Sequence, residues 1–419
     1  MRGFDPGALR ARLGRLRQAA RDGSWVTRRR VVVYSALLIA AWVLVLAWAL
    51  TGRGVMDPLG RPLGTDFVSF WSVSAALLAG APALAYHPAA LAGWERALFG
   101  PGVPFYAWFY PPTALLLVAP LGLLPYLWSL ALWLGGGLVV YLLVLRRILR
   151  DRTGMLAVLA FPAVFVTLSH GQNAFLTTAL FGGAMLSLEK RPWLAGVLIG
   201  ALSFKPQLGL LIPLALIARG EGRAFAAAAA TALGLAALSA LIFGLSPWAG
   251  FWTGAELARR TLEEGLVPFA KQQSVFAAVR LLGGGIAAAY AVQAAVSAAA
   301  AAAVVWAWRQ PGALDLKAAA LAAACLLAAP FVLDYDQLLL ALPIAWMAER
   351  LRRDGGAPFE KTGLALAALL PLLARPAAVL FALPLSPLII GLLLALLLRR
   401  IAAAGRRDAV EGALLTGSA

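Results

Sequence analysis

The chain has 419 residues, of which 62% are hydrophobic and only 13% charged, and its formal net charge at pH 7 is +17. A soluble protein of this length has roughly 25% charged residues, so the composition excludes an ordinary soluble domain. Several apolar runs reach about 20 residues, which is enough to cross the hydrocarbon core of a bilayer. Because no run alternates with a period of two, we expect spanning helices and not a barrel.

The basic residues occur in short clusters between the apolar runs, as they do in cytoplasmic loops of membrane proteins. This bias accounts for the positive charge without a nucleic-acid partner. The single cysteine, Cys325, lies in an apolar run and allows no intrachain disulfide. The predicted fold class is therefore all-α: a polytopic membrane protein with about twelve helices, some of them short or broken.

Residues 1–30 form a basic arm without an apolar run, and the first span follows at 31–50. This span is too long for the apolar core of a signal peptide. We therefore expect an uncleaved anchor and a cytoplasmic N-terminus. The basic arm is a candidate for contact with anionic lipid.

Residues 51–110 form the longest segment without a clear span, and the topology places them on the outer face. Apolar residues recur there at helical spacing over 67–78 and 88–98, which predicts two short helices lying at the membrane surface. Asp66 stands immediately before the first of them. Two interpretations of this acid stay open: a general base that takes a proton from a hydroxyl, or the N-cap of the helix.

The next apolar stretch, 111–145, contains two prolines and predicts one broken span. The basic cluster at 146–152 follows it and should be cytoplasmic. A rival arrangement makes 111–124 and 126–145 separate spans. It puts the basic cluster outside, against the positive-inside bias, and ranks second.

Two polar turns then interrupt the apolar sequence. Short spans at 154–168 and 173–188 are joined by a turn that contains His170, Gln172 and Asn173. The stretch 193–218 is interrupted by Lys205-Pro206-Gln207, which predicts a shallow hairpin with Lys205 at its outer tip. On the favoured topology both turns lie on the same side of the membrane as Asp66.

The remaining chain continues in the same way. A second outer loop, 246–280, contains Lys271 and Gln272, and another polar sequence, Asp334-Tyr335-Asp336, follows a span on the outer side. Residues 31–400 are predicted to form one transmembrane domain, followed by a cytoplasmic tail at 401–419. The spans of this part are expected at 225–245, 286–308, 313–332, 337–349, 362–382 and 385–398.

Ionisable residues at membrane depth are functional candidates by default. Lys205 suits a phosphate, or it is a lysine that snorkels to the membrane surface. Arg375 has the same functional interpretation, and its alternative is an ion pair with a carboxylate such as Asp336. Lys271 and Gln272 suit a sugar or a phosphate, or they face solvent. The full set predicted on the outer side is Asp66, Lys205, Lys271, Arg280, Asp334, Asp336 and Arg375.

The sequence predicts neither a metal site nor a cofactor. The two histidines, His87 and His170, are far apart and have no cysteine cluster beside them. The Asp334-Tyr335-Asp336 spacing has the form of a metal motif, but a structural role at a helix mouth is favoured. No phosphate-binding glycine loop or hydrolase motif occurs.

The order of several short motifs resembles glycosyltransferase family 87, the polyprenol-phosphate-mannose-dependent mannosyltransferase-like membrane proteins of the GT-C class. The resemblance extends from about residue 31 to residue 400, and it rests on order and spacing. Its motifs are Asp66-Phe67, Gly80…Tyr86, Tyr110-Pro111-Pro112, Gly171-Gln172-Asn173, Ala195-Gly196…Lys205-Pro206, Gln272-Gln273-Ser274 and Pro330…Asp334-Tyr335-Asp336.

The resemblance implies transfer of a hexose, usually mannose, from a polyprenyl-phosphate carrier to a lipid or glycan acceptor on the outer face of the inner membrane, with inversion. Asp66 matches the family's loop-one acid, the base for the acceptor hydroxyl. A histidine is often found near positions 334–336 in such proteins, and this chain has none there. By resemblance or position, the expected donor-phosphate residues are Lys205, Lys271 and Arg375, and the expected cavity residues are Tyr110, His170, Gln172, Asn173, Gln207, Gln272, Asp334 and Asp336.

This chemistry needs only one strong acid. Polyprenyl phosphate is an activated leaving group, and nearby cations stabilise the charge that develops as the sugar departs. One carboxylate then serves as base, where glycosidases use two. The alternatives are a transporter or flippase for a lipid-linked saccharide, which needs no base, and a non-catalytic subunit in which Asp66, Lys205 and Arg375 never meet.

Overall fold

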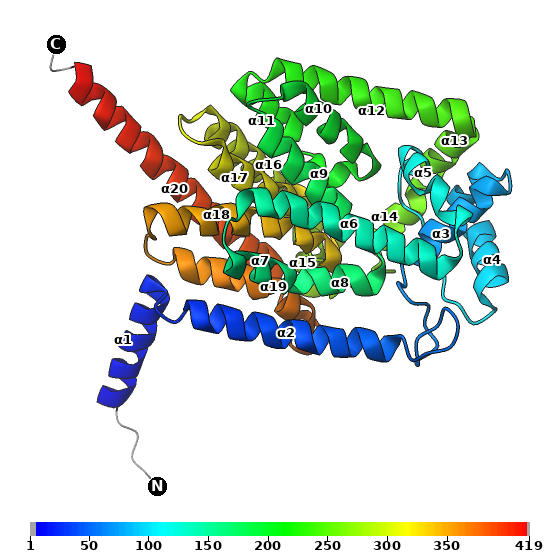
Figure 1. The fold of residues 1–419 in the computed structure, drawn as a ribbon, viewed down its shortest axis with the longest axis horizontal. Helices are drawn as coiled ribbons and strands as arrows, with labels where there is room; N and C mark the ends of the chain where they lie inside the picture. The colour runs from blue at the N-terminus through cyan, green and yellow to red at the C-terminus, as the bar shows by residue number, and fades with distance from the viewer. Residues whose placement is uncertain (1–5, 417–419) are drawn as a thin grey trace, which may run out of the picture.

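The computed structural model describes residues 6–416 (Figure 1). The first five residues of the predicted basic arm and the last three of the predicted tail lie outside the described residues. Over 6–416 the chain is helical, without a β-strand, and two isolated bridges join Met56 to Pro62 and Gln272 to Leu333. The all-α prediction is therefore confirmed.

Six of the described helices are long and apolar enough to cross a membrane, judged by length and composition. A seventh span results if α7 (Arg152–Leu159) and α8 (Pro162–His170), bent by 41°, count as one. In Figure 1, α2, α6 and α12 lie roughly parallel along the long axis of the molecule. The six are α2 (Arg28–Ala49), α6 (Tyr126–Ile148), α12 (Gly222–Phe243), α16 (Ile286–Arg309), α19 (Glu360–Phe381) and residues Leu385–Gly405 of α20 (Leu385–Thr416).

The predicted number of about twelve membrane helices is not confirmed. At 1.5 Å per residue, a helix of 8 to 15 residues is about 12–22 Å long, which is short of a bilayer core of about 30 Å. Prolines, glycines, polar turns or charged residues lie close to the ends of these helices and keep them short, although their apolar runs look like spans in the sequence. They are α9 (Ala174–Ser187), α10 (Pro192–Ala201), α11 (Ile212–Arg219), α17 (Leu314–Ala328) and α18 (Ala341–Asp354).

The two short helices predicted in the segment 51–110 are present. They are α3 (Phe67–Leu78) and α4 (Pro88–Phe99), joined through the 3-10 helix η1 (Pro82–Tyr86). They gather at one end of the molecule, called below the Asp66 end (Figure 1). Other short elements at this end are α5 (Thr113–Val118), the 3-10 helix η2 (Ala119–Leu123), α13 (Ser246–Thr253) and α14 (Ala255–Glu263).

The break predicted within 111–145 falls at its two prolines. Pro120 lies in η2, and α6 begins directly after Pro125. Because α5 and η2 are too short to cross a membrane, α6 is the one membrane-length helix described within 111–148. This agrees with the favoured arrangement of one broken span.

The segment 246–280 was predicted to be an outer loop, but it contains the helices α13 and α14 and most of a third, α15 (Val275–Leu281). α13 begins with Pro247 in its first turn, and α15 is capped by Ser274, whose hydroxyl accepts from the N–H of Ala277. Proline in the first turn and serine at the N-cap are both helix-start signals. These two signals indicate helices that the spacing of apolar residues alone does not predict.

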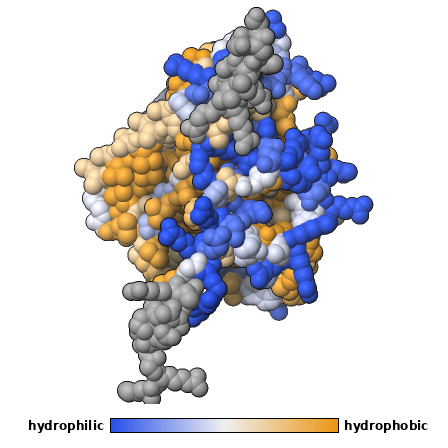
Figure 2. All heavy atoms as spheres, turned by 90° about the vertical axis from the view of Figure 1, so that its left-hand side faces the viewer, coloured by the Kyte–Doolittle hydropathy of each residue, from blue (hydrophilic) through white to orange (hydrophobic). Residues whose placement is uncertain are grey.

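Arginines gather at the opposite end, called below the arginine end. Figure 2 faces this end and shows hydrophilic side chains over much of it. Arg146, Arg147 and Arg150 are exposed there at the end of α6, and Arg352 and Arg353 are exposed at the end of α18. Two of the basic clusters that lie between apolar runs in the sequence therefore share one face of the protein.

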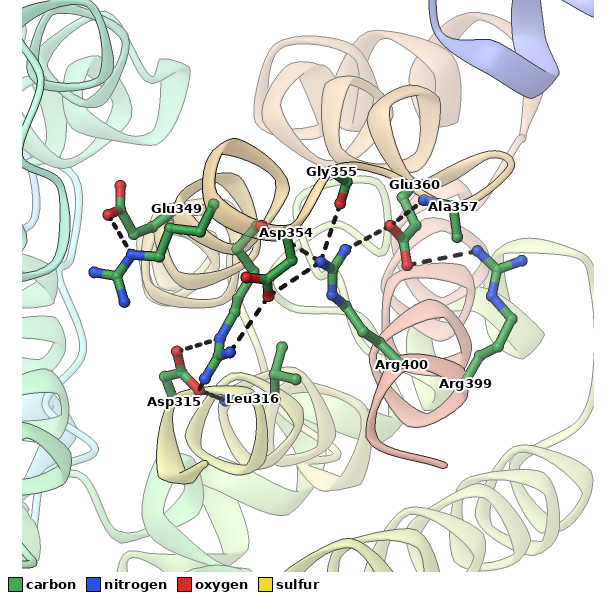
Figure 3. A network of polar contacts seen from close by, with 11 residues as sticks. Asp315, Leu316, Glu349, Asp354, Gly355, Ala357, Glu360, Arg399 and Arg400 are labelled. Atoms are coloured by element: carbon green, nitrogen blue, oxygen red, sulfur yellow. Dashed lines mark hydrogen bonds and ion pairs between the residues drawn. The ribbon is translucent and has the colours of Figure 1, made fainter. Parts of the chain in front are cut away.

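A polar network at the arginine end ties four helices together (Figure 3). Arg350 of α18 pairs with Asp315 of α17 at 2.7 Å and with Asp354 at 3.3 Å. Arg400 of α20 pairs with Glu360 of α19 at 2.7 Å and with Asp354 at 3.5 Å. Glu360 is only 1% exposed, so Arg400 offsets the cost of its burial.

Helices α10 and α12 pack closely because glycine lies at their contact. A Cβ at Gly196 would overlap the carbonyl oxygen of Ala224 and the Cβ of Ala227. A Cβ at Gly200 would lie 2.6 Å from the carbonyl oxygen of Ala228. Small residues allow helix backbones in membranes to approach in this way.

Gly196→Leu should therefore force α10 and α12 apart and destabilise the protein by about 1–3 kcal/mol, the usual cost of overpacking. Thermal unfolding of purified protein in detergent measures the effect. Gly234→Leu on α12 is the matched control, because a side chain there meets nothing within 4 Å. Equal melting temperatures for the two variants would contradict this packing.

Candidate active site

Two turns meet at the Asp66 end through glycine. Gly64 (φ +69°) precedes α3, and Gly171 (φ +66°) joins α8 to α9. A Cβ at Gly171 would lie 2.7 Å from the carbonyl oxygen of Gly64 and 2.6 Å from the Cβ of Phe67. The indole N–H of Trp133 donates to the carbonyl oxygen of Gly171 at 3.1 Å. The two backbones therefore touch, and the residues after each glycine are brought together.

Asp66 is oriented toward the second turn. It occupies the N-cap position of α3 but makes no side-chain cap hydrogen bond. Its Oδ2 instead accepts from Nε2 of Gln172 at 2.9 Å, and Oε1 of Gln172 accepts from the hydroxyl of Tyr110 at 3.2 Å. Asp66 is therefore the N-cap residue by position, but its side chain does not cap the helix. Asp66 also lies beside other polar residues, as an enzymatic base must.

Lys205 lies in the break between two 3-10 helices, η3 (Leu202–Phe204) and η4 (Pro206–Gly209), at the tip of the predicted hairpin. It is 3% exposed, and its ammonium donates to Oδ1 of Asn173 at 3.1 Å. It also forms an ion pair with Oδ1 of Asp336. The snorkelling alternative is wrong, because the ammonium group is buried and faces an acid.

The Asp334-Tyr335-Asp336 sequence begins a 3-10 helix, η5 (Asp334–Leu340), between α17 and α18. Its two acids point to different cations. Asp336 pairs with Lys205, while Oδ2 of Asp334 lies 3.2 Å from Arg375 of α19. Asp336, suggested as the partner of Arg375, is therefore the wrong acid. The residues described contain no cluster of three His, Cys, Asp or Glu of the kind that holds a metal.

Tyr335, which was not among the site residues expected from the sequence, lies at the centre of these contacts. Its buried ring has the ammonium of Lys205 at 5.0 Å and that of Lys271 at 5.9 Å from its centroid. The ring of His170 lies 5.9 Å away. The sequence does place this aromatic residue between two acids, which attract cations. Cations often lie against aromatic rings in proteins, so this neighbourhood could have indicated Tyr335.

Lys271 differs from the other two cations. Among the side chains described, those of residues 12–405, it has no carboxylate within 4.0 Å, whereas Lys205 and Arg375 each have one. The neighbouring Gln272 is buried and joined to the η5 loop through a backbone bridge to Leu333. Its side-chain oxygen is buried without a hydrogen-bond partner. Gln207 is half-buried, and no hydrogen bond in the described part of the chain joins it to this network.

Some of the charged side chains in the site form ion pairs, and others do not. Three acids face three cations, and two pairs form: Asp336 with Lys205, and Asp334 with Arg375. In the region described, Asp66 has only the neutral amide of Gln172 as a side-chain partner, and Lys271 has no acid. The arrangement therefore leaves one carboxylate able to accept a proton and one cation able to bind an anion.

An apolar groove lies beside the polar network. It has a volume of about 180 Å³. The ring of Trp108 in its wall lies 5.0 Å from the ring of Tyr110, and the hydroxyl of Tyr86 donates to the carbonyl oxygen of Tyr110 at 3.1 Å. Its aromatic lining consists of Tyr86, Phe105, Trp108, Phe109, Phe251 and Trp252. The groove and the Asp66 network therefore share Tyr110 as a common neighbour.

Glu95 of α4 fixes the segment that carries Tyr110. It is fully buried, and its Oε2 accepts from the backbone N–H of Tyr106 at 3.0 Å, while Oε1 has no partner. Burial raises the pKa of Glu95 to about 7, although the N–H of Tyr106 and the charge of Arg96 oppose the rise. The residue is therefore a titrating group close to neutral pH.

Residues 108–332 match the model of glycosyltransferase family 87, which covers more than half of the chain. The matched stretch includes Tyr110, Gln172, Asn173 and Lys205 and ends just before Asp334. Searches of the curated proteins and of the solved structures found no match.

The buried ion pair predicts a stability effect. Lys205→Met leaves the carboxylate of Asp336 buried without its cation, which should cost about 3–5 kcal/mol. Adding Asp336→Leu removes the stranded charge and should restore most of the loss. Thermal unfolding in detergent compares the three proteins. A single variant as stable as the parent would contradict the pairing.

Glu95 predicts a pH effect with a definite sign. Because its pKa is about 7 in the folded protein and 4.5 is the ordinary value, the fold favours the protonated acid. This stability is complete below about pH 4.5 and is lost as pH rises through about 7.

Glu95→Gln keeps an acceptor for Tyr106 and does not titrate. The melting temperature of the parent minus that of Glu95→Gln should therefore fall between about pH 5 and pH 8. Thermal scans in matched buffers measure it. A difference that stays constant or rises with pH would overturn the assignment.

Proposed function

Since this chain belongs to glycosyltransferase family 87 and is a membrane glycosyltransferase, we propose that it moves a hexose, mannose, from a polyprenyl-phosphate carrier to a lipid or glycan acceptor. Asp66 acts as the general base. The reaction takes place at the Asp66 end, on the outer face of the inner membrane. The chain termini lie on the cytoplasmic side, with the arginines of the opposite end, as the positive-inside bias requires.

One observation carries the proposal: Asp66 is a half-buried carboxylate with no cation partner in the described chain, held in place by Gln172. A carboxylate that is oriented but not neutralised keeps its capacity to take a proton. The amide of Gln172 fixes its direction, and Tyr110 fixes the amide. A transporter has no need of a base held in this way.

The reaction balances with this single acid. The acceptor hydroxyl gives its proton to Asp66, and its oxygen bonds to the anomeric carbon as the bond from that carbon to the phosphate oxygen breaks. Polyprenyl phosphate leaves with the electron pair. Because the oxygen attacks from the side opposite the phosphate, the configuration at the anomeric carbon inverts.

Cations on the far side of the site stabilise the departing phosphate. Lys271 is the first candidate, because it has no acid partner in the described residues. Arg375 is 49% exposed and can exchange Asp334 for a phosphate. Lys205 is engaged with Asp336 and Asn173, so its proposed role is to position Asn173 beside Gln172.

The apolar groove supports a substrate that is attached to lipid. Its aromatic wall adjoins Tyr110, so an isoprenoid chain in the groove would end close to the polar network. Apolar lining with a few polar groups at one end is typical of sites for such ligands.

Asp66→Asn tests the base directly. The amide keeps the size of the side chain but cannot accept the proton, so kcat should fall by about 10²- to 10⁴-fold. The purified protein is assayed with a radiolabelled polyprenyl-phosphate sugar and a membrane extract as the source of acceptor. Binding of the labelled donor should remain close to that of the parent.

Asp57→Asn is the matched control in the same segment. Asp57 accepts from the backbone N–H groups of Leu59 and Arg61, and an asparagine oxygen can accept both bonds. This variant should retain activity. If Asp66→Asn transferred sugar at the parental rate, or if the protein moved the lipid-linked sugar across a bilayer without transfer, the proposed reaction would be wrong.

A further inference from the structure

The helix before the first span, α1 (Pro6–Asp22), has an apolar stripe flanked by arginines. Leu13, Leu16 and Ala20 fall within about 60° of one another at 100° per residue. Arg12 and Arg17 fall on either side of the stripe, and Gln18 falls on the opposite face. This is the pattern of a helix that lies in a membrane interface.

The apolar stripe contacts the rest of the protein at the C-terminal end of α1 and is exposed further toward the N-terminus. At its C-terminal end, the carbonyl oxygen of Arg21 accepts from the N–H of Phe359, and that of Ala20 accepts from the hydroxyl of Thr362. Both partners lie at the start of α19, and Ala20 is half-buried. Further along, Leu13 is 56% exposed and Leu16 is 59% exposed. The apolar face therefore begins against a membrane-length helix and passes beyond the protein.

The direction of α1 fits a membrane surface. In Figure 1, α1 leaves the start of α2 steeply inclined to it and points away from the helical body. Since α2 is long and apolar enough to cross a membrane, a helix that crosses its direction at its end lies along the membrane plane. The exposed leucines then lie at the depth of the headgroups.

The positive charge of α1 indicates that the membrane surface it contacts is anionic. The described side chains of α1 include the exposed Arg12, Arg15, Arg17 and Arg21, with Asp22 as the acid at its end. Three more exposed arginines, at 28–30, follow directly at the start of α2. Arginine side chains beside an apolar stripe extend their stems over it and place their guanidinium groups among phosphates.

We propose that α1 binds the anionic lipid headgroups of the membrane around the protein, with Leu13, Leu16 and Ala20 turned toward the acyl chains. The interaction anchors the arginine end and is separate from the transfer reaction. It does not depend on the proposed function, because none of these residues belongs to the Asp66 network.

A fluorescent reporter on the full chain tests this. Leu16→Cys and Gln18→Cys are labelled separately with an environment-sensitive NBD dye, since the native Cys325 is fully buried. Each protein is reconstituted into vesicles of phosphatidylcholine alone, or with about one third phosphatidylglycerol. Both leaflets have the same lipids, so the orientation of the protein in the vesicle does not matter.

In anionic vesicles the dye at position 16 should emit at shorter wavelength and about twofold more strongly than in phosphatidylcholine, whereas the dye at position 18 should not change. Replacing Arg12, Arg15 and Arg17 together by glutamine should abolish the difference, and about 0.5 M salt should reduce it. Equal responses at the two positions, or equal responses in the two lipids, would overturn the proposal.

Discussion

The candidate site depends on the contact between two glycine turns. Gly64 and Gly171 bring the backbone before α3 against the turn between α8 and α9, and a side chain on Gly171 would overlap the other turn. This contact lets Gln172 reach the carboxylate of Asp66. The next residue, Asn173, reaches Lys205, and Lys205 reaches Asp336. A series of polar contacts thus runs from Asp66 to Asp336. It depends on the close approach of the two glycine turns.

This polar chain is costly within an apolar protein. A buried ion pair such as Lys205 with Asp336 is often replaceable by apolar residues without loss of stability, so stability alone does not explain it. The network at the arginine end differs, because its members other than the buried Glu360 are partly exposed and join helix ends. The protein therefore has one polar cluster that ties helices together and another, around Asp66, to which we assign the chemistry of the proposed reaction.

Much of the fold followed from the sequence, because apolar periodicity and polar interruptions are local signals. The bounds of α3, those of α4 to within one residue, and the helix break at Lys205 were predicted in this way. The number of complete spans was not, since a run of apolar residues does not show where a polar turn stops a helix partway. The pairing of Arg375 with Asp334, and the central place of Tyr335, depend on side-chain directions in η5 that spacing does not encode.

The central claim is that Asp66 and the cations face the two ends of one reacting bond. An experimental structure with a bound polyprenyl-phosphate sugar tests it most directly. In that structure the phosphate should lie beside Lys271 and Arg375, and the sugar should lie between the phosphate and the carboxylate of Asp66. A donor bound with its phosphate at the arginine end, or with Asp66 outside contact with sugar and acceptor, would contradict it.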